Sequence, residues 1–144
     1  MNDDQLQTIS PIDGRYIEKT AHLREYFSES ALNRYRVLTE IRWLLFLSEH
    51  NDLNQIPTLS DDLKRQLDEI ITQFSIDDAK AIKSIEKETN HDVKAVEYFL
   101  QEKLSNLSGG KDLIPFIHFA CTSEDINNIS YAIMLKDACD SQYR

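Results

Sequence analysis

The chain has 144 residues, a length typical of one domain, and it is 41% hydrophobic and 28% charged, as in globular proteins. Lysine and arginine total 16 against 25 aspartates and glutamates, and this net charge of −9 argues against nucleic acid as a partner. The longest apolar run, Trp43–Leu47, is far shorter than the roughly 18 residues of a membrane span, which argues against a membrane protein.

Glycine and proline, with three residues each, make up about 4% of the chain against an average near 12%, so long helices are expected. The N-terminal sequence Met-Asn-Asp-Asp-Gln has neither the basic region nor the apolar segment of a signal peptide. We therefore expect a cytoplasmic location, in which Cys121 and Cys139 are free thiols.

The first predicted element is an N-terminal arm. Up to about Tyr16 the sequence has no hydrophobic period, and Pro11, Asp13 and Gly14 favour an ordered loop. Arg15 lies beside a tight turn and could offer its planar guanidinium to a phosphate, while the Tyr16 hydroxyl adds a donor. The alternative is a surface turn with a solvated arginine and a packed tyrosine.

A long helix is predicted from about Ser28 to His50. Apolar residues recur there at three- and four-residue steps: Leu32, Tyr35, Leu38, Ile41 and Leu45. Additional apolar residues around Trp43 leave little polar face, and such a helix is normally covered on several sides. A partner chain could supply part of that cover.

Two further helices are predicted after a short connection at Pro57. Ser60 is a favourable N-cap for the first of them, and Ser75 with Asp78 has the spacing of a capping box for the second. The apolar stripe of the first comprises Leu63, Leu67, Ile70, Ile71 and Phe74. The apolar positions of the second are Ile76, Ala79, Ile82 and Ile85.

The polar sequence Thr89-Asn90-His91-Asp92 then interrupts the helical pattern. A helix N-terminus presents free backbone N–H groups and a favourable dipole, so an anion could bind where the next helix begins. His91 could donate a hydrogen bond to a ligand oxygen or act in proton transfer. The alternative is that Asn90 or Asp92 caps the following helix and that His91 is a solvated loop residue.

Two more helices complete the predicted architecture. The first carries Val93, Val96, Phe99, Leu100 and Leu104. Ser108-Gly109-Gly110 is the clearest loop, and Pro115 is predicted to open a short apolar turn. The last helix carries Ile126, Ile129, Ile133 and Met134.

Thr122-Ser123-Glu124-Asp125 marks the start of the last helix. Thr122 and Asp125 have capping-box spacing, and the two hydroxyls with the free amides could also cradle a carboxylate. These two interpretations are compatible. His118 and Cys121 have the spacing of zinc ligands, but there is no second pair, so no metal site is predicted.

The sequence therefore predicts an all-α fold, because no period-two strand pattern of useful length occurs. We expect residues 1–144 to form one helical domain preceded by the arm. The last helix reaches Arg144 without a glycine or proline stop signal, which suggests a piece of a longer protein that ends inside a helix.

Three blocks of the sequence resemble the adenylosuccinate lyase family, its bacterial branch in particular. They are Ser10–Tyr16, Thr89–Glu97 and His118–Asn128. The last two occur in variants across the fumarase/aspartase superfamily, whereas the Asp-Gly-Arg-Tyr arm and Lys94–Glu97 point to this member. The resemblance covers essentially the whole chain, but only the N-terminal third of such an enzyme.

The resemblance implies cleavage of fumarate from adenylosuccinate, and from the succinylated aminoimidazole carboxamide ribotide, by a β-elimination without metal or organic cofactor. It implies that Arg15 and Tyr16 contact the nucleotide phosphate. Asn90, His91 and Asp92 would lie along the substrate, with His91 as a supporting donor. The hydroxyls of Thr122 and Ser123 would hold a carboxylate of the succinyl group.

The family's general acid and base belong to later segments, and its members are homotetramers whose active sites draw on three subunits. The resemblance therefore implies that this chain alone is inactive. Two alternatives remain open on the sequence. One is a lyase of the same superfamily that acts on argininosuccinate, and the other is a non-catalytic helical interaction module, to which the apolar Trp43–Leu47 segment would contribute.

Overall fold

The structure is a computed structural model that describes residues 7–50 and 55–142. Within these residues every regular element is helical, so the all-α prediction is confirmed. The elements are the 3-10 helix η1 (Ala21–Leu23), α2 (Arg24–Phe27), α3 (Glu29–Glu49), α4 (Asp61–Thr72), α5 (Ile76–Thr89), α6 (Asp92–Ser105), the 3-10 helix η2 (Gly110–Phe116) and α7 (Ser123–Gln142). None of the described helices combines the length and apolar character that crossing a membrane requires.

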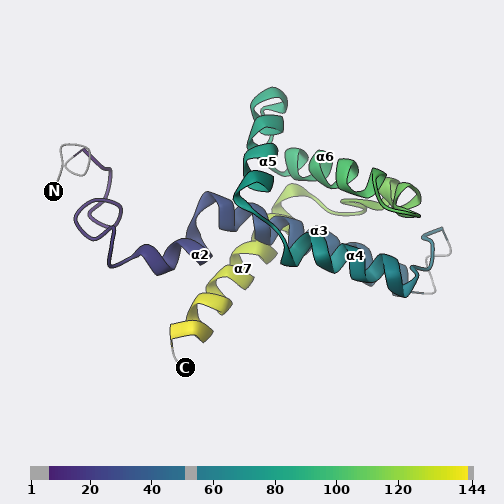
Figure 1. Cartoon of the computed structure of the whole chain (residues 1–144), viewed down its shortest axis with the longest axis horizontal. Coiled ribbons are helices and arrows are strands. Elements are labelled where there is room, and N and C mark those ends of the chain that lie inside the picture. Colours follow the sequence, from purple (N-terminus) through teal and green to yellow (C-terminus); the bar gives the residue numbers. More distant parts are fainter. Residues whose placement is uncertain (1–6, 51–54, 143–144) are drawn as a thin grey trace.

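The helix α3 lies at the centre of the fold and packs against α2, α4, α5, α6 and α7 (Figure 1). Ser28 caps it, because its hydroxyl accepts from the Ala31 N–H at 3.1 Å. The expected cover on several sides is confirmed, and the neighbouring helices supply it for most of α3, whereas Phe46 is 49% exposed. The most buried positions differ in part from the predicted stripe, since Val37 and Leu44 are buried whereas Leu38 is only half-buried.

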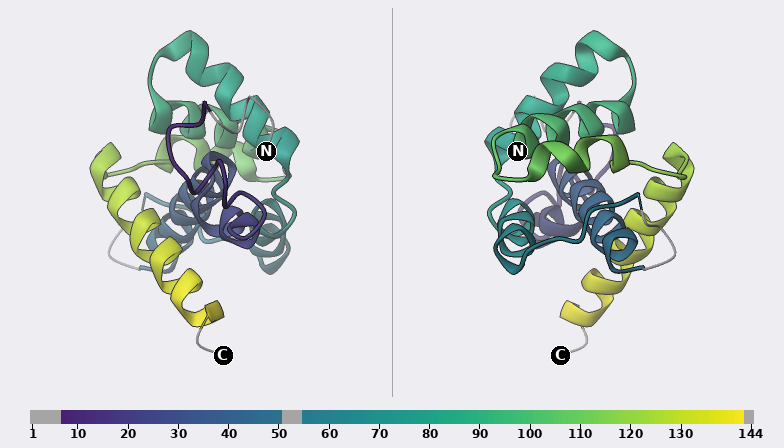
Figure 2. Two further views of the ribbon diagram at one scale, coloured as in Figure 1. Left: turned by 90° about the vertical axis from the view of Figure 1, so that its left-hand side faces the viewer. Right: turned by 90° about the vertical axis from the view of Figure 1, so that its right-hand side faces the viewer.

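The helices α4, α5 and α6 enclose the main core against α3, and α7 runs along another side of α3 (Figure 2). The predicted caps at Ser60 and at Ser75 with Asp78 are confirmed, the latter as a reciprocal capping box. Two of the apolar positions read from the sequence lie outside the core: Ile76, in the first turn of α5, is 60% exposed, and Ile129 on α7 is 50% exposed. The predicted apolar positions of α6 are all buried, namely Val93, Val96, Phe99, Leu100 and Leu104, and Ala95 is buried as well.

The arm before α2 is ordered by its own hydrogen bonds and projects from the helical body along the longest axis of the molecule (Figure 1). The Gly14 N–H donates to the Ser10 carbonyl at 3.1 Å, and the Tyr16 N–H to the Pro11 carbonyl at 2.9 Å. The Thr20 hydroxyl donates to the Ile12 carbonyl at 3.0 Å. These local bonds confirm the predicted ordered arm.

The connection between α6 and α7 differs from the prediction. The helix η2 begins at Gly110, so Pro115 lies inside it and does not open the apolar turn. A Cβ atom at Gly110 would lie 2.2 Å from the Leu104 carbonyl oxygen, so the chain reverses closely here only with glycine. Tyr143 and Arg144, at the predicted end of the last helix, lie outside the described residues.

Asn33 on α3 is fully buried, and neither its amide oxygen nor its amide nitrogen has a partner among the described residues. A buried polar group without a hydrogen bond costs about 1–3 kcal/mol. Asn33→Leu, which has a similar shape, should therefore raise the free energy of unfolding by about 1 kcal/mol. Urea denaturation of the two chains tests this, and an equal or lower midpoint for the variant would contradict it.

Asp78 should make the fold sensitive to acid. Burial raises its pKa, but the ion pair with Lys103 at 2.7 Å and the hydrogen bonds from Ser75 outweigh burial, so the pKa lies below its ordinary 3.8. A depressed pKa stabilises the folded state above pH 3.8, and this contribution is lost as pH falls through the folded-state pKa. Asp78→Asn should thus cost most stability at pH 7 and progressively less below pH about 4. Denaturation of both chains across this range measures it, with the exposed Asp77→Asn as the control.

Candidate functional site

The polar sequence between α5 and α6 forms the first part of the site. Asn90 ends α5 in a left-handed conformation, with φ 52° and ψ 33°. His91 is the N-cap of α6, because its Nδ1 accepts from the Lys94 N–H at 3.1 Å. The prediction that Asn90 or Asp92 caps α6 is therefore wrong. The left-handed Asn90 ends one helix, and only the extended His91 has the backbone geometry of an N-cap.

This capping role fixes what His91 can offer to a ligand. Since Nδ1 accepts a hydrogen bond, the hydrogen of the neutral ring resides on Nε2. The side chain is 50% exposed, so Nε2 is available as a donor at the surface. The ring thus caps α6 through Nδ1, a role that neither interpretation of the sequence gave to His91, and leaves Nε2 for other partners.

Asp92 is held by two neighbours. Its Oδ1 accepts from the Val93 N–H at 2.9 Å, and its Oδ2 pairs with the guanidinium of Arg36 on α3. Partial burial would raise the pKa of Asp92, but the Val93 N–H and the Arg36 charge lower it more, so the carboxylate is favoured. Asp92 therefore carries a fixed negative charge beside His91.

The start of α7 forms the second part of the site. The Thr122 hydroxyl donates to Asp125 Oδ2 at 2.8 Å, and the Asp125 N–H donates back to the hydroxyl at 3.4 Å, which confirms the predicted capping box. The hydrogen bonds of Thr122 hold the pKa of Asp125 below its usual range. Ser123 is half-buried, and its hydroxyl has no hydrogen bond to any described residue. Capping thus accounts for Thr122 but leaves the Ser123 hydroxyl free.

The buried Arg36 joins these two parts. Besides its ion pair with Asp92, its Nε donates to Asn127 Oδ1 on α7 at 2.9 Å. One side chain on α3 therefore connects the α5–α6 junction to the N-terminal part of α7. Thr39 and Ser130 add a buried hydroxyl pair at 3.2 Å between α3 and α7.

A second buried ionisable group, Glu40, lies one turn after Arg36 on α3 and contacts His118. Burial raises the pKa of Glu40, and His118 offsets this in part. Neither Arg36 nor Glu40 was predicted from the sequence. The available signal was weak: Arg36 and Glu40 are a basic and an acidic residue one helical turn apart in a helix with little polar face, but Arg42 on the same helix is exposed.

The arm forms a separate place in this chain. The Arg15 guanidinium lies 4.7 Å from the centre of the Tyr16 ring, and both side chains are exposed. Among the described residues no hydrogen bond or ion pair joins the arm to Asn90–Asp92 or to Thr122 and Ser123. The expected packed tyrosine of the alternative interpretation is therefore wrong, because Tyr16 is 38% exposed.

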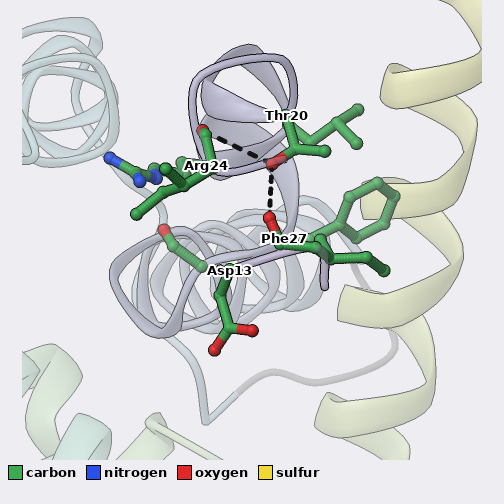
Figure 3. Close-up of a pocket in the computed structure, with 8 residues that line it drawn as sticks. Asp13, Thr20, Arg24 and Phe27 are labelled. Carbon is green, nitrogen blue, oxygen red and sulfur yellow. Dashed lines mark hydrogen bonds between the residues drawn. The ribbon is translucent and has the colours of Figure 1, made fainter. Parts of the chain in front are cut away.

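A pocket of about 230 Å³ lies between the arm and α2 (Figure 3). Asp13, Thr20, Arg24 and Phe27 contribute to its lining, and Thr20 is fixed by its hydrogen bond to the Ile12 carbonyl. Neither Arg15 nor Tyr16 lines it. Among the described residues no group of three or more metal-ligating side chains occurs, so His118 and Cys121 gain no third ligand.

Comparison with known proteins gives the family. A family described as Lyase matches residues 14–143. Adenylosuccinate lyase from Legionella pneumophila strain Philadelphia 1 is 50% identical over 133 residues, which cover 92% of this chain and 29% of that protein. Adenylosuccinate lyase from Escherichia coli K12 is 50% identical over 140 residues, 97% of this chain and 31% of that protein. The corresponding protein from Vibrio cholerae is 51% identical over 136 residues, 94% of this chain and 30% of that protein.

The chain thus spans less than a third of the length of these relatives and matches their N-terminal part. The family match covers nearly the whole chain, including the residues from Gly14 onward and both parts of the site on α5–α6 and α7. The chain belongs to the Lyase family of the fumarase/aspartase superfamily.

Proposed function

We propose that this chain is the N-terminal part of an enzyme that cleaves adenylosuccinate to AMP and fumarate, and the succinylated aminoimidazole carboxamide ribotide to its carboxamide and fumarate. The observation that carries this proposal is the identity of about half of all residues to proteins named adenylosuccinate lyase. In addition, Arg36 joins two of the three candidate parts of the site, the α5–α6 junction and the start of α7.

The reaction is a β-elimination. A base removes a proton beside a carboxylate of the succinyl group, and an acid protonates the departing nitrogen. The intermediate carries additional negative charge on that carboxylate, so fixed hydrogen-bond donors aimed at it lower the barrier. The free hydroxyl of Ser123 at the N-terminus of α7 is a donor of this kind.

The site residues take these roles in the proposal. Thr122 and Ser123 hold the carboxylate, and Nε2 of His91 donates to the substrate as a supporting group. Asn90 and Asp92, the sequence neighbours of His91, lie along the substrate. Arg15 and Tyr16 bind the nucleotide phosphate. For this role the arm must lie close to the Asn90–Asp92 and Thr122–Ser123 parts of the site, within an assembly of several subunits.

The assembly in this proposal is a cytoplasmic homotetramer formed by the longer protein, and this chain ends inside the first helix that leads toward its helical bundle. The general acid and base lie in the segments beyond residue 144. The 144-residue chain alone should therefore show no adenylosuccinate cleavage. An ultraviolet absorbance assay with purified chain checks this, and turnover above the uncatalysed rate would contradict it.

The proposed activity itself is tested with the complete natural reading frame that contains this chain. Conversion of adenylosuccinate to AMP and fumarate, followed by absorbance, is the expected result. Argininosuccinate serves as the matched control substrate, because a superfamily member of the other specificity would cleave it instead. A folded tetramer that cleaves neither substrate would overturn the proposal.

One observation favours the second candidate, a helical interaction module. An apolar groove of about 480 Å³ lies between α3 and α7. Trp43 and Phe46, whose rings stack 5.4 Å apart, form one wall, and Ile129, which is 50% exposed, forms part of the other. Absence of lyase activity from the complete protein would make this groove the first surface to study.

A further inference from the structure

The turn that leads into α7 is held by two side chains of α3. The Glu40 carboxylate accepts from the His118 backbone N–H at 3.1 Å through Oε2 and contacts the His118 Nδ1 at 2.6 Å through Oε1. The Trp43 indole N–H, nearly one helical turn later, donates to the Phe119 carbonyl at 2.8 Å. Three polar contacts from one face of α3 therefore fix two consecutive residues of this turn.

The held backbone is one that side chains normally avoid. His118 and Ala120 have φ values of 60° and 58°, in the left-handed region that favours glycine. Such a conformation costs about 1 kcal/mol or more and persists only where the surrounding structure enforces it. The contacts from Glu40 and Trp43 supply that enforcement just before the Thr122 and Ser123 corner.

The same contacts set the state of the His118 ring. A carboxylate has only acceptors, so its contact with Nδ1 places the ring hydrogen on Nδ1. Nε2 then lacks a hydrogen in the neutral ring and lies 3.9 Å from Glu97 Oε1. Glu97 is itself paired through its other oxygen with Lys94 at 2.7 Å, so α6 closes the far side of the ring.

We propose that Glu40 is a positioning residue of the lyase reaction, which acts through the backbone and ring of His118 to hold the Thr122–Ser123 corner in its carboxylate-binding geometry. The role of Glu40 in the reaction rests on the proposed function, whereas the clamp, meaning the two contacts of Glu40 with His118, is observed in the structure. Glu40 is 2% exposed and contributes from α3, so it does not itself need to touch the substrate.

The test is Glu40→Gln in the complete natural protein. Glutamine has the same shape, but its amide replaces one of the two acceptor oxygens by an NH2 donor, so the two contacts, which use different oxygens, cannot both be kept. We expect kcat/KM for adenylosuccinate to fall at least about tenfold, as misplacing a positioned donor does. The matched control is Glu49→Gln on the same helix, whose surface pair with Lys64 should leave kcat/KM within about twofold.

The second measurement is the tautomer of His118, read by solid-state ¹⁵N NMR of protein labelled at its four histidines. His118→Asn, which tolerates the left-handed backbone, assigns the signals. The wild-type neutral ring should carry its hydrogen on Nδ1, and Glu40→Gln should move it to Nε2. This readout tests the contact between Glu40 and His118 directly, whereas kcat/KM tests whether that contact serves the reaction.

The outcomes separate the two proposals. Wild-type protein that cleaves no adenylosuccinate refutes the proposed function, while the tautomer still tests the clamp. A Glu40→Gln enzyme with kcat/KM within twofold of wild type overturns the positioning role. A wild-type ring with its hydrogen on Nε2 overturns the clamp, and it does so even where Glu40→Gln fails to fold.

Discussion

Arg36→Met should lower the free energy of unfolding by about 3 kcal/mol, the lower end of the cost of breaking a buried ion pair. Arg36 is 3% exposed, and the variant leaves Asp92 and Asn127 without their shared donor. The cost is at the lower end because Asp92 is 42% exposed and can recover water. Chemical denaturation measures it.

The same variant should lower kcat/KM of the complete protein by about 100-fold, since displacement of a catalytic group by about 1 Å can have this effect. Both parts of the candidate site lose their common attachment to α3. Arg42→Met is the matched control on the same helix, because Arg42 and its partner Asp68 are each about half exposed. Its pair should contribute less than about 1 kcal/mol. Equal kinetics for the two variants would contradict the bridging role of Arg36.

Ser123→Ala should lower kcat/KM of the complete protein by roughly 100-fold, as loss of one fixed donor to a developing charge commonly does. It should change the free energy of unfolding by less than about 0.5 kcal/mol, because the hydroxyl has no partner among the described residues. Thr122→Ala is the contrasting variant, since it removes the capping box and should cost about 1 kcal/mol. Wild-type kinetics for Ser123→Ala would show that Thr122 and Ser123 serve only to begin α7 and do not bind the substrate.

The corresponding pair at the other part of the site is His91→Ala and His91→Asn. Alanine removes both the cap of α6 and the imidazole, whereas asparagine retains a favourable N-cap acceptor. Both should lower kcat/KM by roughly 100-fold if the ring is the donor to the substrate. Only His91→Ala should also lower the melting temperature, and circular dichroism measures this. Restored kinetics in His91→Asn would show that the cap, not the ring, matters.

The features predicted correctly are those that neighbouring residues determine. The caps at Ser60, Ser75 and Thr122 follow from side chains that bond to the backbone three residues later, so a short stretch of sequence contains all the information. The N-cap of α6 was assigned wrongly because the choice depends on which residue, Asn90 or His91, adopts the left-handed conformation.

The features that were missed depend on distant parts of the chain. The structural roles of Arg36 and Glu40 depend on partners on α6, α7 and the turn at His118, none of which is near in sequence. A hydrophobic pattern cannot distinguish a charged residue on a solvated face from one that joins two buried elements. The three candidate places on the arm, at Asn90–Asp92 and at Thr122–Ser123 were identified as motifs, but only the fold brings two of them together.

The central position of α3 also determines how this domain opens. Segments that contact only one neighbour exchange their amide hydrogens through local fluctuations, whereas an element enclosed by most others is released only with the whole domain. Val37 and Ile41, both at most 1% exposed, belong to that last-released segment. Because Arg36 lies in the same turns, the spacing between the two joined parts of the site should persist through a partial opening of α4 or of the arm.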